Sequence, residues 1–195
     1  MGPRSGRDGA ATPVAVMMGP VDDARANAGA AGAEPRWLDE DEDRTWRDLL
    51  AMTQLLQVSL DRQMRAEAGM PQTYYTVLAM LSEAPGRQLR MSELAAITTS
   101  SPSRISHAVT RLEEKGWVQR SRAADDGRGA VAALTDEGWD VLHRTAPGHV
   151  EQVRRVLFDP LSSAQRAQLG DICQAVLGAL AHTRHGARRE ECGDV

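Results

Sequence analysis

The sequence predicts a mainly α-helical fold with one small β-hairpin, and three observations support this prediction. Apolar residues recur at spacings of three and four in residues 49–64 and again in residues 169–180, as they do on one face of a helix. Between these stripes, residues 117–120 and 130–134 have the pattern of two short strands, separated by a turn rich in Asp and Gly. With 195 residues, 42% hydrophobic and 26% charged, the chain has a globular composition.

The composition excludes several classes of protein. The apolar runs are only a few residues long, so no segment is expected to span a membrane. No charged segment followed by an apolar run opens the chain, so we expect no signal peptide. The two cysteines, Cys173 and Cys192, are too few for a disulfide framework or a zinc knuckle. We therefore expect a cytoplasmic protein, neither secreted nor embedded in a membrane.

The two ends of the chain differ from the middle. Residues 1–36 hold six Gly, nine Ala and four Pro, with no aromatic residue and no sustained period. This composition predicts a disordered arm. Residues 183–195 are polar and are expected to form a frayed tail. One folded domain is therefore expected over residues 37–182.

Two helices are predicted at the start of this domain. Acidic residues at 39–43 suit the N-terminus of a long helix, and Gly69 ends it. Pro71 is predicted to open the second helix at its first position, and Pro85–Gly86 to stop it.

The middle of the domain is predicted to form two shorter helices and the hairpin. A short helix is predicted around 92–97, followed by a turn of Thr and Ser residues. Ser101 and Pro102 are predicted as the N-cap and first residue of the next helix, which Gly116 ends. The hairpin follows, with its turn at 123–129.

Three further helices are predicted after the hairpin. Thr135 caps the first, and Pro147–Gly148 is expected to separate it from a short second one. The residues Ser162 to Gln165 fit a capping box that opens the last helix.

The order helix, helix, helix, strand, turn, strand over residues 71–140 is that of a winged helix-turn-helix. A helix enters a major groove only if one side docks on a scaffold and the other is small or polar. In the helix that begins at Pro102, the scaffold side is formed by Ile105, Val109 and Leu112.

Polar side chains that could bind DNA lie elsewhere on this helix. Those able to bind base edges or phosphates are Ser103, Arg104, Ser106, His107, Thr110 and Arg111. Ser101 and the free amides of the first turn suit a phosphate. The alternative is an ordinary surface helix that carries a few polar residues.

The charge is unevenly distributed along the chain. The net charge is −4, but residues 87–128 contain eight basic and five acidic residues, which gives +3 there and −7 elsewhere. Arg128, at the tip of the hairpin, could enter a minor groove and respond to its negative potential. The alternative is a solvent-exposed turn, in which Asp and Gly are common.

Five segments together resemble regulators of the MarR type. They are residues 89–95 (LRMSELA), 101–105 (SPSRI), 111–118 (RLEEKGWV), 126–128 (DGR) and 133–138 (ALTDEG). In that order they resemble the start of the reading head, the two ends of the recognition helix, the wing, and the helix after the wing. The resemblance runs from about Trp37 to His182.

This resemblance implies a fold and a function. The fold is mainly α with a small β-wing: a winged helix-turn-helix head at 71–140, flanked by dimerisation helices at 37–68 and 146–182. The function is that of a homodimeric, ligand-responsive regulator, most often a repressor, on a pseudo-palindromic operator. The two apolar stripes also exceed what one head would bury, which favours a partner surface. The alternative is that they pack on each other within a monomer.

The resemblance also assigns candidate site residues. It places Ser103, Arg104, His107 and Arg111 on the major-groove face and Arg128 at the minor groove, with Asp126 orienting the wing. A small aromatic or acidic effector is expected between the head and the dimer base. Candidate walls for its pocket are Trp46, Tyr74 and Tyr75, which could equally be core residues.

Some features depart from the family or point elsewhere. Arg90 stands where relatives often have a capping Thr or Ser, so the start of that helix is open. Cys173 lies on an apolar stripe and is interpreted as a core residue, which disfavours a thiol switch. The histidines, including His182 and His185, lack the ligand set of a good metal site, so neither a metal nor a cofactor is expected.

The sequence carries no motif of an enzyme. It has no phosphate-binding Gly-rich loop, no His-Glu-x-x-His segment and no Gly-x-Ser-x-Gly elbow, so no catalytic activity is expected. The alternative function is a winged-helix dimerisation module that binds a protein partner without sequence-specific DNA binding.

Overall fold

The computed structural model describes residues 35–122 and 129–190, with side chains described as far as Ala181. The chain divides into two units, residues 1–42 and 43–195. In the first unit, the Asp39 carboxylate accepts hydrogen bonds from the backbone N–H groups of Asp41 and Glu42, at 2.9 and 2.8 Å. Most of the predicted arm, the end of the predicted tail and the tip of the wing lie outside the described residues.

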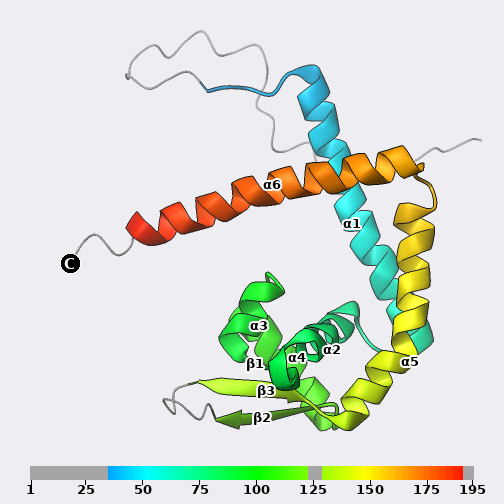
Figure 1. Ribbon diagram of the computed structural model, residues 1–195, viewed down its shortest axis with the longest axis vertical. Coiled ribbons are helices and arrows are strands. Elements are labelled where there is room, and N and C mark those ends of the chain that lie inside the picture. The colour runs from blue at the N-terminus through cyan, green and yellow to red at the C-terminus, as the bar shows by residue number, and fades with distance from the viewer. Residues whose placement is uncertain (1–34, 123–128, 191–195) are drawn as a thin grey trace, which may run out of the picture. The chain divides into compact units, whose positions relative to one another are not determined.

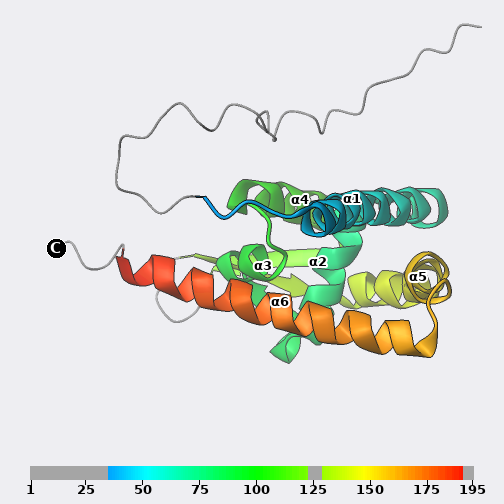
Figure 2. The ribbon, with the colours of Figure 1, turned by 90° about the horizontal axis from the view of Figure 1, so that it is seen from above.

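The predicted fold class is confirmed: the described residues form mostly helices, with one small antiparallel sheet (Figures 1 and 2). The helices are α1 (Glu40–Ala68), α2 (Gln72–Glu83), α3 (Met91–Ile97), α4 (Pro102–Glu114), α5 (Asp136–Val153) and α6 (Ser163–Glu190), with a 3-10 turn η1 (Pro85–Arg87) and a π-helical turn η2 (Arg154–Phe158). The strands are β1 (Gln88–Arg90), β2 (Val118–Arg122) and β3 (Ala130–Leu134), in the sheet order β1-β3-β2.

The sheet attaches the wing to the helical head. Val118 of β2 lies opposite Leu134 of β3, and Arg122 lies opposite Ala130 at the end where the wing begins. Strand β1 was not predicted, because its three residues are too few to show an alternating pattern. It pairs with β3 through Gln88 opposite Ala133.

Several predicted helix starts are confirmed by their hydrogen bonds. The Ser101 hydroxyl accepts the backbone N–H of Arg104 at 3.3 Å, and the Thr135 hydroxyl accepts that of Gly138 at 3.0 Å. The capping box at residues 162–165 has both of its reciprocal bonds, at 2.9 and 3.3 Å. Pro71 was predicted as the first residue of α2. It is instead the N-cap, and the helix begins at Gln72.

The predicted helix ends at Gly69 and Gly116 are confirmed, and the start of α3 is defined by a hydrogen bond. Gly69 and Gly116 have φ values of +62° and +75°, the left-handed conformation that glycine adopts without strain. Arg90 precedes α3 and has no capping hydroxyl, but its backbone N–H donates to the Glu93 carboxylate at 3.0 Å. Glu93 thus satisfies a backbone donor at this end of the helix.

The predicted break at Pro147–Gly148 is wrong, because α5 runs through both residues. A Cβ on Gly148 would lie 2.5 Å from Oε2 of Glu67 and 3.3 Å from Nε2 of Gln63. The glycine therefore allows α5 to approach α1 closely. This tertiary contact outweighs the low intrinsic helix propensity of the pair.

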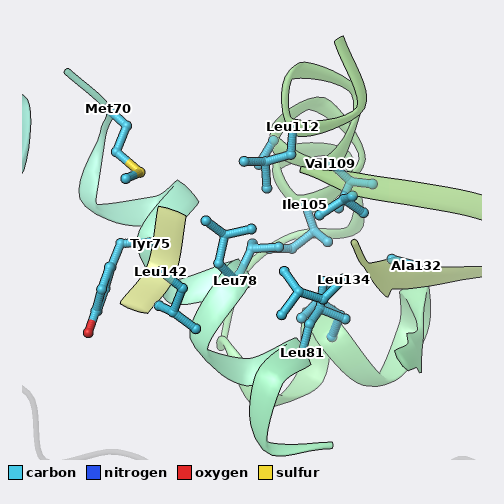
Figure 3. Close-up of a cluster of buried hydrophobic side chains, with 14 of the residues drawn as sticks. Met70, Tyr75, Leu78, Leu81, Ile105, Val109, Leu112, Ala132, Leu134 and Leu142 are labelled. Atoms are coloured by element: carbon cyan, nitrogen blue, oxygen red, sulfur yellow. The ribbon is translucent and has the colours of Figure 1, made fainter. Parts of the chain in front are cut away.

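The core lies in the head (Figure 3). Val77, Leu78 and Leu81 of α2 are fully buried. They meet Leu94 of α3, the scaffold residues of α4, and Ala132 and Leu134 of β3. Leu142 brings α5 onto the same cluster. The core thus holds α4 in a fixed orientation on the other helices of the head.

The apolar stripe of α6 is exposed, whereas that of α1 is exposed only in its first half. On α6, the side chains of Ile172, Val176, Leu177 and Leu180 are each more than half exposed. On the α1 stripe, Leu49 and Met52 are exposed, and Leu60 and Met64 are buried. The α6 stripe is therefore not covered by the α1 stripe within one chain, which contradicts the alternative that the two pack on each other in a monomer.

Two further observations concern these helices. Cys173 is exposed, so its interpretation as a core residue is wrong for the single chain. It lies on the same apolar stripe, which the single chain leaves uncovered.

Among residues 35–122 and 129–190, no helix is both long and apolar enough to cross a membrane.

Candidate nucleic-acid interface

Helix α4 has one buried side and one exposed polar side. Ile105, Val109 and Leu112 are fully buried, as the sequence predicted. The exposed residues of the polar side include Ser101, Ser103, Arg104, His107 and Arg111, and Ser106 and Thr110 are half-buried. The helix therefore has the two-sided form that major-groove docking requires.

The two arginines of this polar side differ in their surroundings. Arg104 forms no ion pair with another described residue. Nη1 of Arg111 lies 2.8 Å from Oε2 of Glu114, and this hydrogen bond raises the pKa of Arg111. Arg104 is thus free to bind an anion, whereas a DNA phosphate or base would have to compete with Glu114 for Arg111.

A polar network joins α4 to β2. The backbone N–H of Arg120 donates to Oε1 of Glu113 at 3.0 Å, and its guanidinium forms an ion pair with Oε2. Nη2 of Arg120 also donates to the Thr110 hydroxyl at 3.0 Å. Sequence reasoning missed this network, because the pairing depends on how β2 docks beside α4.

The base of the wing lies at the ends of β2 and β3. Arg122 is exposed there. Gly129 has a φ of +103°, and a Cβ on it would lie 3.8 Å from Nη1 of Arg90. The predicted wing residues Asp126 and Arg128 lie outside the described residues.

The turn between α3 and α4 contains a strained residue. Thr99 has a φ of +50°, which is unusual for a β-branched side chain. Next to it, the Thr98 hydroxyl donates to the Leu94 carbonyl oxygen at 2.7 Å, and the backbone N–H of Ser100 donates to the carbonyl oxygen of Ala95 at 3.0 Å. These bonds hold the turn in the geometry that presents the N-terminus of α4.

A polar cavity of about 710 Å³ lies between α1, α2 and the start of α4. It is lined by Gln57, Val58, Asp61, Arg62, Arg65, Gln72, Thr73, Thr76, Thr98, Ser100 and Arg104. Three arginines and one acidic residue, Asp61, are among these residues. Hydrogen bonds from the Arg65 side chain, at 2.6 Å, and from the backbone N–H of Gln72, at 3.0 Å, lower the pKa of Asp61. Oε1 of Gln72 is buried without a hydrogen-bond partner in the described part of the chain.

The three predicted pocket residues do not line this cavity. Trp46 is half exposed on α1, Tyr74 packs on the core, and Tyr75 is buried in it. The Tyr75 ring lies 4.4 Å from that of His149, measured between centroids. Burial raises the pKa of Tyr75 and lowers that of His149. The residues that do line it were not predicted as pocket walls, because they are mostly polar and come from four separate segments.

The described histidines, His107, His143 and His149, are not gathered into a ligand set. Within the described residues, no group of three or more His, Cys, Asp or Glu side chains could hold a metal ion. The side chains of His182 and His185 lie outside the described part.

An amphipathic α4 behind α3, followed by a β-hairpin, defines a winged helix-turn-helix. A model of the MarR family matches residues 68–129 of the chain. A crystal structure of Sco3205, a MarR family transcriptional regulator from Streptomyces coelicolor in complex with DNA, is 49% identical to the chain, with a TM-score of 0.69. The match covers 74% of this chain and 94% of that one. The crystal structure of AbsC, a MarR family transcriptional regulator from the same organism, is 34% identical to the chain and has a TM-score of 0.69. That match covers 76% of this chain and 99% of AbsC.

The chain belongs to the MarR family of transcriptional regulators. Among curated relatives, the transcriptional repressor MprA of Escherichia coli K12 is 26% identical over 112 residues. That match covers 57% of this chain and 63% of the repressor, so it spans less than two thirds of that relative. These relatives are regulators by name and not enzymes.

Proposed function

We propose that this protein is a DNA-binding transcription regulator that represses by binding a pseudo-palindromic operator as a homodimer in the cytoplasm. The observation that carries the proposal is the exposed polar side of α4, with Arg104 unpaired among the described residues and a fully buried scaffold behind it. The structure of a DNA-bound relative at 49% identity supports the same use of this fold.

The contacts follow from the positions on α4. Ser103, Arg104, His107, Thr110 and Arg111 would face the major groove, and Ser101 with the first-turn amides would bind a phosphate. Arg128 would enter the minor groove, with Asp126 shaping the wing. No observation favours the alternative of a module that binds only protein partners.

The test is a gel shift of the purified protein against DNA upstream of its own gene, with nonspecific competitor and a salt titration. A specific shift is expected. The Arg104→Ala variant is expected to weaken it by about 1–3 kcal/mol if Arg104 contacts a base, or to reduce the salt slope by about one if it contacts a phosphate. A wild-type protein that binds no fragment above competitor would contradict the proposal and favour a protein partner.

The exposed apolar residues of α1 and α6 would form the dimer base. Residues 37–68 and 146–182 carry apolar side chains that the single chain leaves exposed, including Leu55 of α1 and Leu177 of α6. Covering such a surface with a second copy would stabilise both chains through the hydrophobic effect.

The cavity beside α4 suits an acidic effector, aromatic or not. Arg62 can attract a carboxylate, for which Arg65 would have to leave its ion pair with Asp61. The methylene groups of the long side chains give an aromatic ring some apolar contact. Arg104 lines this cavity and also belongs to the DNA-facing side of α4. An anion bound there would compete with DNA for Arg104 and lower operator affinity.

A panel of aromatic carboxylates added to the operator complex tests this part. At least one is expected to release DNA from the wild-type protein and to lose its effect on Arg62→Ala. Release that is equal in both proteins would place the effector outside this cavity.

A further inference from the structure

We propose that Thr110 recognises a thymine in each operator half-site through its γ-methyl group, and that Arg120 is the positioning residue that holds its hydroxyl toward the protein. The inference rests on the proposed function, because it needs α4 to lie in a major groove. It replaces the simple expectation of a hydrogen bond from Thr110 to a base.

The hydroxyl of Thr110 has no proton left for DNA. A threonine hydroxyl has one proton and two acceptor sites. Oγ1 of Thr110 donates its proton to the Ser106 carbonyl oxygen at 2.9 Å and accepts from Nη2 of Arg120 at 3.0 Å. It therefore cannot donate to the acceptors that guanine and thymine present in the major groove.

Arg120 is itself held in place from two sides. Its main chain is part of β2, where it pairs with Ala132 of β3. Its backbone N–H and its guanidinium both bind the Glu113 carboxylate, and the side chains of the pair are about one-third exposed. Because the guanidinium of Arg120 is planar and is bound to Glu113, its Nη2 points toward the Thr110 hydroxyl in a fixed direction.

Thr110 lies on the side of α4 that carries the other candidate contacts. It follows His107 by three residues and Ser103 by seven, spacings that share one helix face. It is half-buried, so part of the side chain remains accessible. The hydroxyl keeps one acceptor site but has no proton left. Thymine presents only its O4 acceptor and its methyl group in the major groove, so the γ-methyl is the group of Thr110 that can contact a thymine there.

The test removes single methyl groups from the DNA. In the operator fragment that the gel shift identifies, each thymine is replaced in turn by deoxyuridine, which differs only by that methyl group. Binding of the wild-type protein is expected to weaken about fourfold at one position per half-site, the effect of losing one buried methyl group. Replacing the symmetry-related pair is expected to weaken it about sixteenfold.

Three variants assign the effect to its residues. Thr110→Ser keeps the hydroxyl and lacks the methyl, so it is expected to bind the thymine and uracil fragments equally at that position. Thr110→Val keeps a methyl without the hydroxyl and is expected to retain some preference for thymine. Arg120→Lys keeps a charge beside Glu113 but lacks the planar fork, and it is expected to reduce the thymine preference.

Each result has a defined meaning. A uracil scan that is the same for the wild-type protein and Thr110→Ser would overturn the role of Thr110. A full thymine preference in Arg120→Lys would overturn the positioning role of Arg120. Failure of the proposed function is distinguishable, because the wild-type protein would then bind no fragment at all.

Discussion

At the residue scale, the polar side of α4 is partly neutralised by the protein's own acidic groups. Glu114 pairs with Arg111, and Glu113 pairs with Arg120. Counting charges along the sequence therefore overstates the positive charge available to DNA. Arg104 and Arg122 are exposed residues of the head for which the structure shows no ion pair within its described part.

Neutralising Glu114 should strengthen DNA binding. Glu114→Gln removes the carboxylate that competes for Arg111 and also removes a negative charge near the phosphates. Because exposed ion pairs contribute up to about 1 kcal/mol, operator affinity should rise by up to about fivefold. Titration by fluorescence anisotropy checks this, with Glu151→Gln on α5 as the matched control. An equal rise in both variants would show a general charge effect and not release of Arg111.

His149 should make the stability depend on pH. Burial lowers the pKa of His149 from its ordinary value of 6.5, and its Nδ1 has no hydrogen-bond partner in the described part of the chain. The unfolded chain therefore binds a proton more readily, so the free energy of unfolding should fall as the pH drops below about 6.5. His149→Phe keeps a ring beside Tyr75 and should lose this part of the decrease. Denaturant unfolding between pH 7 and 5 measures it, and parallel pH profiles for the two proteins would contradict the prediction.

At the element scale, small residues decide how closely α5 can approach its neighbours. A Cβ on Gly138 would lie 2.1 Å from the backbone oxygen of Trp117, which cannot move easily. A Cβ on Gly148 would meet only the end of the Glu67 side chain and Gln63. Gly170 of α6 has no atom within 4 Å of such a Cβ. The same substitution should therefore have three different effects.

The loss of free energy of unfolding caused by alanine should be largest at Gly138, smaller at Gly148 and absent at Gly170. Gly138→Ala should lower the free energy of unfolding most, by about 1–3 kcal/mol, because the backbone must shift. Gly148→Ala should cost less, since Glu67 can rotate away. Gly170→Ala should be neutral or stabilising by up to about 1 kcal/mol, because alanine favours a helix. Denaturant unfolding of the three variants checks the ranking, which a larger loss at Gly170 than at Gly138 would reverse.

At the scale of the whole molecule, the exposed apolar stripe of α6 distinguishes this chain from a self-contained domain. The head has its own core, while Leu177 and Ile172 on α6 are about 60% exposed. An apolar surface of this kind favours association with a second copy.

A charge on the α6 stripe should therefore weaken self-association. Leu177→Glu should shift the protein toward monomer in sedimentation velocity at micromolar concentration, because a carboxylate would have to be desolvated in the interface. It should also weaken operator binding, since two linked heads bind more tightly than one. Gln174→Glu, at a polar position of the same helix, is the control. A dimer that persists in Leu177→Glu would place the interface elsewhere.

The sequence by itself determined the features that depend on local chemistry. The helix caps at Ser101 and Thr135, the glycine ends at Gly69 and Gly116, and the buried spacing of α4 follow from neighbouring residues. For this reason the fold class, the family and the exposed polar side of α4 could be predicted before the structure was known.

Only the tertiary structure decided the features that join distant segments. The continuation of α5 through Pro147–Gly148 depends on its close approach to α1, and the cavity beside Arg104 is built from four separate segments. The engagement of Thr110 by Arg120 depends on the docking of β2 against α4. Packing and side-chain hydrogen bonds between segments far apart in the chain leave no periodic pattern in the sequence, so their effects appear only when the chain is folded.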